Sequence, residues 1–137
     1  MNVKNIALAG IIVGAILLAL MVAINMIMNT IVPMDISSYG GMREMDDPIM
    51  LLFFFYPFVV AFAAAIVFDM VKDSLKGTRV QKGLMFGFLL LIIMTIPSLY
   101  VMFTSMTWPV DFYLSTGLWE IVSFPVAGII FARIWKL

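Results

Sequence analysis

Apolar residues run along this chain in four long stretches, separated by short polar connections. A helix needs about 20 mostly apolar residues to cross a bilayer. Four stretches meet that length, and short connections favour antiparallel neighbours. We therefore predict an all-α, polytopic integral membrane protein: a single membrane domain forming a four-transmembrane-helix antiparallel bundle. The predicted parts are helices at 5–32, 49–71, 83–103 and 112–132, outer loops at 33–48 and 104–111, and an inner turn at 72–82.

Charged residues separate to opposite ends of these helices. Seven of the eight basic residues lie before the first helix, in the inner turn or after the last helix, whereas Arg43 falls on the other side. Because basic residues concentrate in cytoplasmic loops, we expect both termini in the cytoplasm, with the chain in a plasma or inner membrane. Trp135 then lies at the inner boundary, where tryptophan commonly anchors a helix to the interface.

Four bases crowd into the inner turn. We expect them to contact lipid headgroups, where they could also select anionic lipid at about 1 kcal/mol each. These four are Lys72, Lys76, Arg79 and Lys82.

The same turn carries signals for how the second helix ends and the third begins. Gly77 suits a left-handed residue at a helix end, and the run 78–81 has the form of a capping box. Ion pairs three residues apart are expected from Asp69 to Lys72 and from Asp73 to Lys76.

Composition agrees with a membrane location and removes several kinds of chemistry. Hydrophobic residues make up 64% of the chain and charged residues 12%, against about 45–50% and about 25% in soluble proteins. Cysteine and histidine do not occur, which excludes thiolate catalysis and imidazole bases or ligands. Zero net charge implies no polyanionic partner. We expect no catalytic residue, no cofactor, no metal and no nucleic acid.

One minor alternative concerns copper. Met102 and Met106 are four residues apart, which on a helix would put two sulfurs on one face. Over these five residues the pair resembles the methionines of copper uptake channels, and thioethers select Cu(I). Methionine is also an ordinary apolar filler in helices.

Small and polar residues recur every three or four positions along each predicted helix, a spacing that lets helices approach closely in lipid. We expect these stripes to face one another. The stripes are Gly10, Gly14, Leu18, Met21, Asn25 and Asn29; Pro57, Ala61, Ala64, Ala65 and Phe68; Gly83, Gly87, Leu91, Thr95, Ser98 and Met102; and Tyr113, Thr116, Gly117, Glu120, Ser123 and Ala127.

Glu120 falls near the middle of the fourth predicted helix. A carboxylate at that depth costs about 2.5–3.5 kcal/mol if glutamate resembles aspartate. No predicted span contains a basic residue, so we expect a protonated acid within an intramembrane polar cluster. Prolines near this depth also free backbone carbonyls. The expected cluster is Glu120, Ser98, Thr95, Asn25, Tyr56 and Ser123.

Two functions remain open for this cluster. In the first, Glu120 donates a hydrogen bond to a freed carbonyl or to Ser98 and fixes helix register. The chain is then a structural or accessory subunit with a protein partner, or a self-assembling homo-oligomer. In the alternative, Glu120 is the proton or cation site of a small channel or coupled transporter. A partner protein that supplies a base to Glu120 is a further alternative.

Overall fold

The structure is a computed structural model that describes residues 2–33, 35, 38–41, 43–44 and 46–137. These residues are 83% helical and form no strand. In chain order the helical elements are α1 (Val3–Ile31), the 3₁₀ helix η2 (Pro48–Phe55), α2 (Tyr56–Val71), the 3₁₀ turn η3 (Lys72–Ser74), α3 (Arg79–Leu90), the π-helical turn η4 (Leu91–Thr95), α4 (Ile96–Ser105) and α5 (Val110–Ile134).

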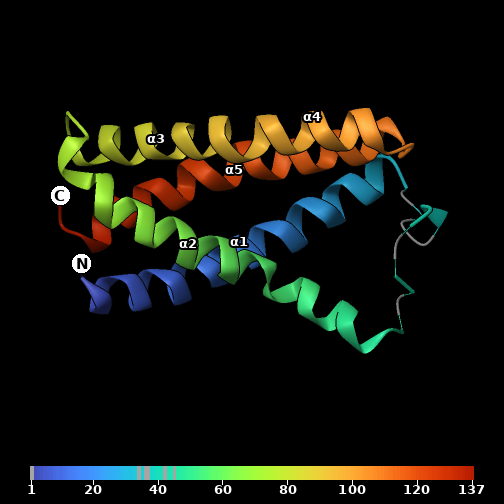
Figure 1. The fold of residues 1–137 in the computed structure, drawn as a ribbon, viewed down its shortest axis with the longest axis horizontal. Helices are drawn as coiled ribbons and strands as arrows, with labels where there is room; N and C mark the ends of the chain where they lie inside the picture. Colours follow the sequence, from blue (N-terminus) through green and yellow to red (C-terminus); the bar gives the residue numbers. More distant parts are fainter. Residues whose placement is uncertain (1, 34, 36–37, 42, 45) are drawn as a thin grey trace.

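Four continuous segments are long and apolar enough to cross a membrane, as predicted. They are Val3–Ile31, Pro48–Ser74, Arg79–Ser105 and Val110–Ile134. Successive segments run in alternating directions, and α1 crosses α2 in an X (Figure 1). Both chain termini and the connection between α2 and α3 lie at the same end of the molecule (Figure 1).

The connection between α2 and α3 follows the predicted signals closely. The capping box is confirmed: the Thr78 side chain accepts from the Gln81 N–H, and the Gln81 side chain accepts from the Thr78 N–H. Helix α3 therefore begins at Arg79, four residues before the predicted start. Gly77 has a left-handed φ of 100°, but it lies in the turn, because the helical segment before it already ends at Ser74.

Only one of the two predicted ion pairs forms in this region. Lys72 Nζ lies 3.2 Å from the Asp69 carboxylate, which confirms the first pair. The pair between Asp73 and Lys76 is wrong, since Asp73 instead lies 3.7 Å from Lys72. The helix tightens to 3₁₀ geometry at Lys72–Ser74 and then becomes extended at Leu75, which removes the helical spacing on which that prediction depended.

Three prolines have three different effects on the helices. Pro57 cannot donate to the Phe53 carbonyl, which accepts instead from the Tyr56 N–H in the 3₁₀ pattern of η2. Before Pro97 the helix widens, and the Ile96 N–H bonds to the carbonyl five residues earlier in the π pattern of η4. Pro125 lies inside α5, which continues through it.

Helices α3 and α5 pack at backbone distance because glycines line their contact. A Cβ placed on Gly83 would lie 2.6 Å from the Ile129 Cα, and one on Gly87 would lie 2.6 Å from the Pro125 Cα. A Cβ on Gly128 would lie 2.1 Å from the Gly83 carbonyl oxygen. The small-residue spacing in the third helix therefore serves close packing, as predicted for helices in lipid.

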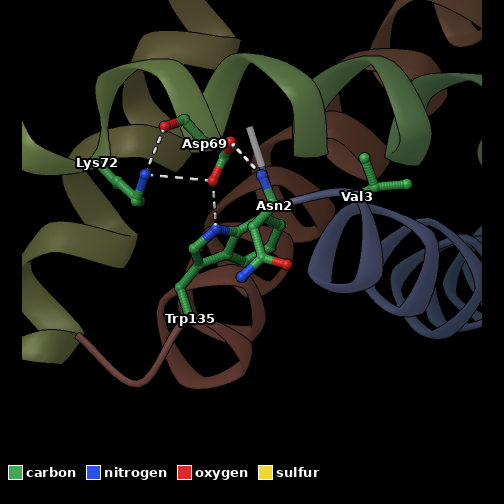
Figure 2. Close-up of a pocket in the computed structure, with 5 residues that line it drawn as sticks. All are labelled: Asn2, Val3, Asp69, Lys72 and Trp135. Atoms are coloured by element: carbon green, nitrogen blue, oxygen red, sulfur yellow. Dashed lines mark hydrogen bonds and ion pairs between the residues drawn. The ribbon is translucent and has the colours of Figure 1, made fainter.

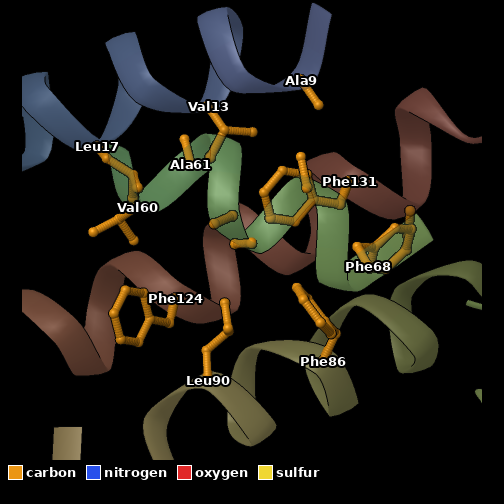
Figure 3. Packing of buried hydrophobic residues seen from close by; sticks show 14 of the residues in the cluster. Ala9, Val13, Leu17, Val60, Ala61, Phe68, Phe86, Leu90, Phe124 and Phe131 are labelled. Carbon is orange, nitrogen blue, oxygen red and sulfur yellow. The ribbon is translucent and has the colours of Figure 1, made fainter. Parts of the chain in front are cut away.

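Helix α1 uses its glycines differently, to receive aromatic rings of α2. A Cβ on Gly10 would lie 2.4 Å from the Phe62 ring, and one on Gly14 would lie 2.4 Å from the Phe58 ring. Figure 3 shows the buried apolar side chains between α1, α2, α3 and α5. At their centre the ring centroid of Phe68 lies 4.9 Å from that of Phe86 and 5.6 Å from that of Phe131.

The predicted inward face of α1 is wrong after Met21, because Asn25 and Asn29 are exposed. Steps of four residues advance the side chain by more than one turn, so a stripe built on them drifts around the helix. The buried face alternates steps of four and three instead. From Gly10 onward it consists of Gly10, Val13, Gly14, Leu17, Met21 and Ile24.

The predicted stripe of the third segment also ends early. Thr95 is buried, but α4 contains no buried residue, and Ser98 is exposed while Met102 is only half-buried. The π turn η4 inserts an extra residue per turn and rotates the helix after it. A stripe counted at constant helical spacing therefore loses its register at Thr95.

Candidate intramembrane polar site

Glu120 lies in the interior of the bundle, on the helix that contacts both α1 and α3. Its side chain is 4% exposed. Trp119 next to it donates to the Leu17 carbonyl at 3.4 Å and so ties α5 to α1 at this level. Ser123, one turn further along α5, is fully buried. The acid therefore faces the other helices of the bundle.

Thr95 approaches this acid from the third segment. It is the last residue of η4, it is buried, and its side chain lies beside the Glu120 carboxyl group. Thr95 is the last buried residue of this segment, because α4 after it has none. Two helical segments thus place Thr95 beside Glu120, and Ser123 follows one turn later on the buried face of α5.

These three side chains share an unusual property. Glu120 Oε2, Thr95 Oγ1 and Ser123 Oγ are buried and have no hydrogen-bond partner among the described residues. Leaving a buried polar group unpaired costs about 1–3 kcal/mol, and more for a charged group. Since more than about 90% of buried polar groups in proteins are paired, three unpaired oxygens on these two segments need an explanation.

Of the other predicted members, Asn25 and Ser98 are exposed, whereas Tyr56 is close enough to Glu120 to interact with it electrostatically. Asn25 is exposed and donates to the Met21 carbonyl at 2.9 Å. Ser98 is exposed and donates to the Thr95 carbonyl at 3.2 Å, so the predicted bond between Glu120 and Ser98 does not form. Tyr56 is 39% exposed, with its ring centroid 6.0 Å from that of Trp119.

A second buried acid, Asp69, lies at the end of the bundle that carries both termini. It is 6% exposed. Its Oδ1 accepts from Trp135 Nε1 at 2.7 Å and lies 3.2 Å from Lys72 Nζ, and its Oδ2 accepts from the Asn2 N–H at 3.0 Å (Figure 2). Asp69 therefore joins the first and last helices to α2.

The sequence predicted only the local pair of Asp69 with Lys72. Trp135 is buried against this carboxylate, so its side chain contacts Asp69 within the protein. The signal for the contact was an acid near the end of one apolar stretch and a tryptophan at the end of another. No spacing rule connects two residues that lie 66 positions apart.

The four bases of the inner turn occupy different environments. Lys72 is paired with Asp69, Lys82 is half-buried, and Lys76 and Arg79 are exposed. Arg79 donates from Nε to the backbone carbonyl of Leu137. Beside them is a groove of about 560 Å³ whose wall changes from polar to apolar along α3. Its lining is Lys76, Gly77, Gln81, Leu84, Met85 and Phe88.

The structure contradicts the alternative of a copper site at Met102 and Met106. Helix α4 ends at Ser105, and Met106 is extended with φ −122° and ψ 144°. The two sulfurs are therefore not on one helical face, and the predicted thioether pair is wrong. Within the described part of the chain, no group of three or more acidic side chains is placed to hold a metal ion.

Comparisons of this chain with protein-family models, with curated proteins and with solved structures find no match. The geometry of the bundle and the chemistry of its side chains therefore carry the functional argument.

Proposed function

We propose that this chain is a multi-pass membrane protein without catalytic activity that acts by assembly in the bilayer. It serves as a structural or accessory subunit beside a protein partner, or associates with copies of itself. The charge distribution supports an orientation with both termini in the cytoplasm and the four bases of the inner turn at the headgroups.

The observation that carries this proposal is the uncovered segment η2. None of its eight residues is buried. Phe53 is 52% exposed and Phe55 is 61% exposed. In Figure 1 the segment runs away from the other helices.

A long uncovered 3₁₀ helix is an unusual way to cross lipid. Runs of 3₁₀ helix beyond three or four residues are uncommon because their hydrogen-bond geometry is poor. Backbone that departs from the α-helix at membrane depth is normally covered by protein. A helix from a neighbouring subunit packed along Pro48–Phe55 would supply that cover and bury its aromatic rings.

The absence of cysteine from the chain makes a direct test simple. In Phe54→Cys, mild oxidation in membranes is expected to produce a disulfide-linked dimer if two copies meet along η2. A disulfide requires Cα atoms within about 7 Å, so the cross-link reports close packing. The matched control is Ile93→Cys, which is 66% exposed on η4, in a different segment.

The outcomes separate the two forms of assembly. Cross-linking of Phe54→Cys without cross-linking of Ile93→Cys supports self-association through η2. If a disulfide adduct with another membrane protein forms at Phe54→Cys and not at Ile93→Cys, the chain is an accessory subunit. Equal behaviour of the two variants contradicts a packed interface along η2.

A further inference from the structure

We propose that Glu120, Thr95 and Ser123 form a buried binding site for one Na⁺ ion, for which the proton competes. The site is separate from η2 and does not depend on the proposed assembly. It begins from the three buried oxygens that lack any hydrogen-bond partner among the described residues.

The chemistry of the three groups points to a cation. An ionised carboxylate is only an acceptor, and the Thr95 and Ser123 hydroxyls can each present lone pairs. Thr95 lies beside the carboxyl group, yet no hydrogen bond of good geometry joins either hydroxyl to Oε2 or to another partner among the described residues. A proton joins two oxygens, whereas a metal ion contacts several at once. One cation among the three oxygens would therefore satisfy all of them.

The charge of the site selects a monovalent ion. Glu120 brings one negative charge, and the apolar interior of the four spans has no basic residue to balance it. The titratable side chain that faces Glu120 from a neighbouring helix is Tyr56, a phenol that is neutral near pH 7. A divalent ion would leave an unbalanced charge in the interior, which is costly. Oxygen ligands favour hard ions over soft ones.

The backbone next to Glu120 lacks one helical hydrogen bond. Pro125 has no N–H to donate to the Ile121 carbonyl, one residue from Glu120. Thr95 ends the π turn η4. Such turns occur frequently at functional sites because they redirect a side chain and loosen the local hydrogen bonding.

The first experiment compares thermal unfolding of the purified protein in NaCl and in choline chloride at equal ionic strength. A ligand that binds only the folded state raises its stability with concentration. Wild type is expected to unfold at a higher temperature in NaCl, and the gain is expected to shrink as the pH falls. Glu120→Gln is expected to show no Na⁺ effect, whereas Glu44→Gln, in the exposed outer loop, behaves as wild type.

The hydroxyl ligands are tested by Thr95→Val and Ser123→Ala. Each is expected to raise the Na⁺ concentration needed for half of the stabilisation by about tenfold, which corresponds to roughly 1.4 kcal/mol. Equal Na⁺ effects in wild type and in Glu120→Gln would overturn the site.

A second measurement covers the case in which Glu120→Gln does not fold. Dicyclohexylcarbodiimide reacts with protonated carboxyl groups in apolar surroundings, and peptide mass spectrometry locates the adduct. In wild type, Na⁺ is expected to slow modification of Glu120, and choline is not. Modification that depends on pH but not on Na⁺ would leave a proton site only and overturn the sodium proposal. A sodium effect without cross-linking at Phe54→Cys would separate this site from the proposed assembly.

Discussion

At the scale of single residues, the two buried acids of the bundle have opposite surroundings. The Asp69 carboxylate has an indole, a backbone amide and an ammonium group as partners. Glu120 Oε2 has no partner among the described residues. A fully bonded carboxylate stabilises one arrangement of the helices, whereas an unpaired one is open to a ligand. We therefore interpret Asp69 as a residue that stabilises the fold, and we propose Glu120 as the cation-binding residue.

Removing the charge of Asp69 is expected to loosen the end of the bundle that carries both termini. In Asp69→Asn the side chain keeps its size but loses its charge and one acceptor oxygen. We expect a lower midpoint of unfolding in SDS–detergent mixtures and earlier hydrogen exchange in α1 and at Trp135. The control is Asp73→Asn, since the Asp73 side chain is 85% exposed and should leave the midpoint unchanged. Equal midpoints for the two variants would contradict the role of Asp69.

Asp47, outside the spans, gives the molecule a pH dependence in acid. Its hydrogen bond from the Ile49 N–H and then its bond from Arg43 hold the pKa of Asp47 below the ordinary value of 3.8. Because the pKa is lower in the folded protein, this contact stabilises the fold above the unfolded value. That contribution is lost as the pH falls through the lowered folded value.

The start of η2 should therefore loosen only in acid, below about pH 4. The measurement is the NMR shift of the Ile49 amide as a function of pH, and Asp47→Asn should remove its acid transition. A transition of the Ile49 amide centred near neutral pH would contradict this assignment.

At the scale of elements, the glycines between α3 and α5 let the two backbones pack so closely that no side-chain methyl group fits. Gly128→Ala places a methyl group 2.1 Å from the Gly83 carbonyl oxygen, where only backbone movement can make room. Overpacking of this kind costs about 1–3 kcal/mol. We expect that loss in the free energy of unfolding in SDS–detergent mixtures.

Gly117→Ala is the matched control on the same helix. Its added methyl group would lie 3.6 Å from the Leu99 side chain, an ordinary contact. We expect wild-type stability for this variant. A loss in Gly117→Ala equal to that in Gly128→Ala would contradict this account, because alanine has the higher helix propensity and only overpacking can make the substitution destabilising.

Hydrophobic length was enough to predict the four segments, and local signals were enough to predict the capping box. The facing surfaces were harder, because they depend on the path of each helix. On α1, the predicted stripe leaves the buried face at Asn25. After the π turn before Pro97, the helix is rotated, so that Ser98 no longer lies on the buried face. Of the predicted polar cluster, Glu120, Thr95 and Ser123 are buried, since Thr95 precedes the change of register and the other two lie on the buried face of α5.

At the scale of the whole molecule, the bundle is well packed at one end and open at the other. The closed end holds both termini, the Asp69 contacts and the aromatic core around Phe68. At the other end η2 runs away from the remaining helices (Figure 1), and none of its own residues is buried. In a bilayer, such an open end is where a second protein chain would add cover to the backbone and aromatic rings.

Assembly in the membrane is the central claim, and its most direct test is the mass of the particle released from source membranes. Extraction into polymer-bounded native nanodiscs keeps neighbouring proteins and lipid in place, and native mass spectrometry then counts the chains. We predict particles that contain either two or more copies of this 15.3 kDa chain or one copy bound to another membrane protein. A single 15.3 kDa chain surrounded only by lipid would contradict the account.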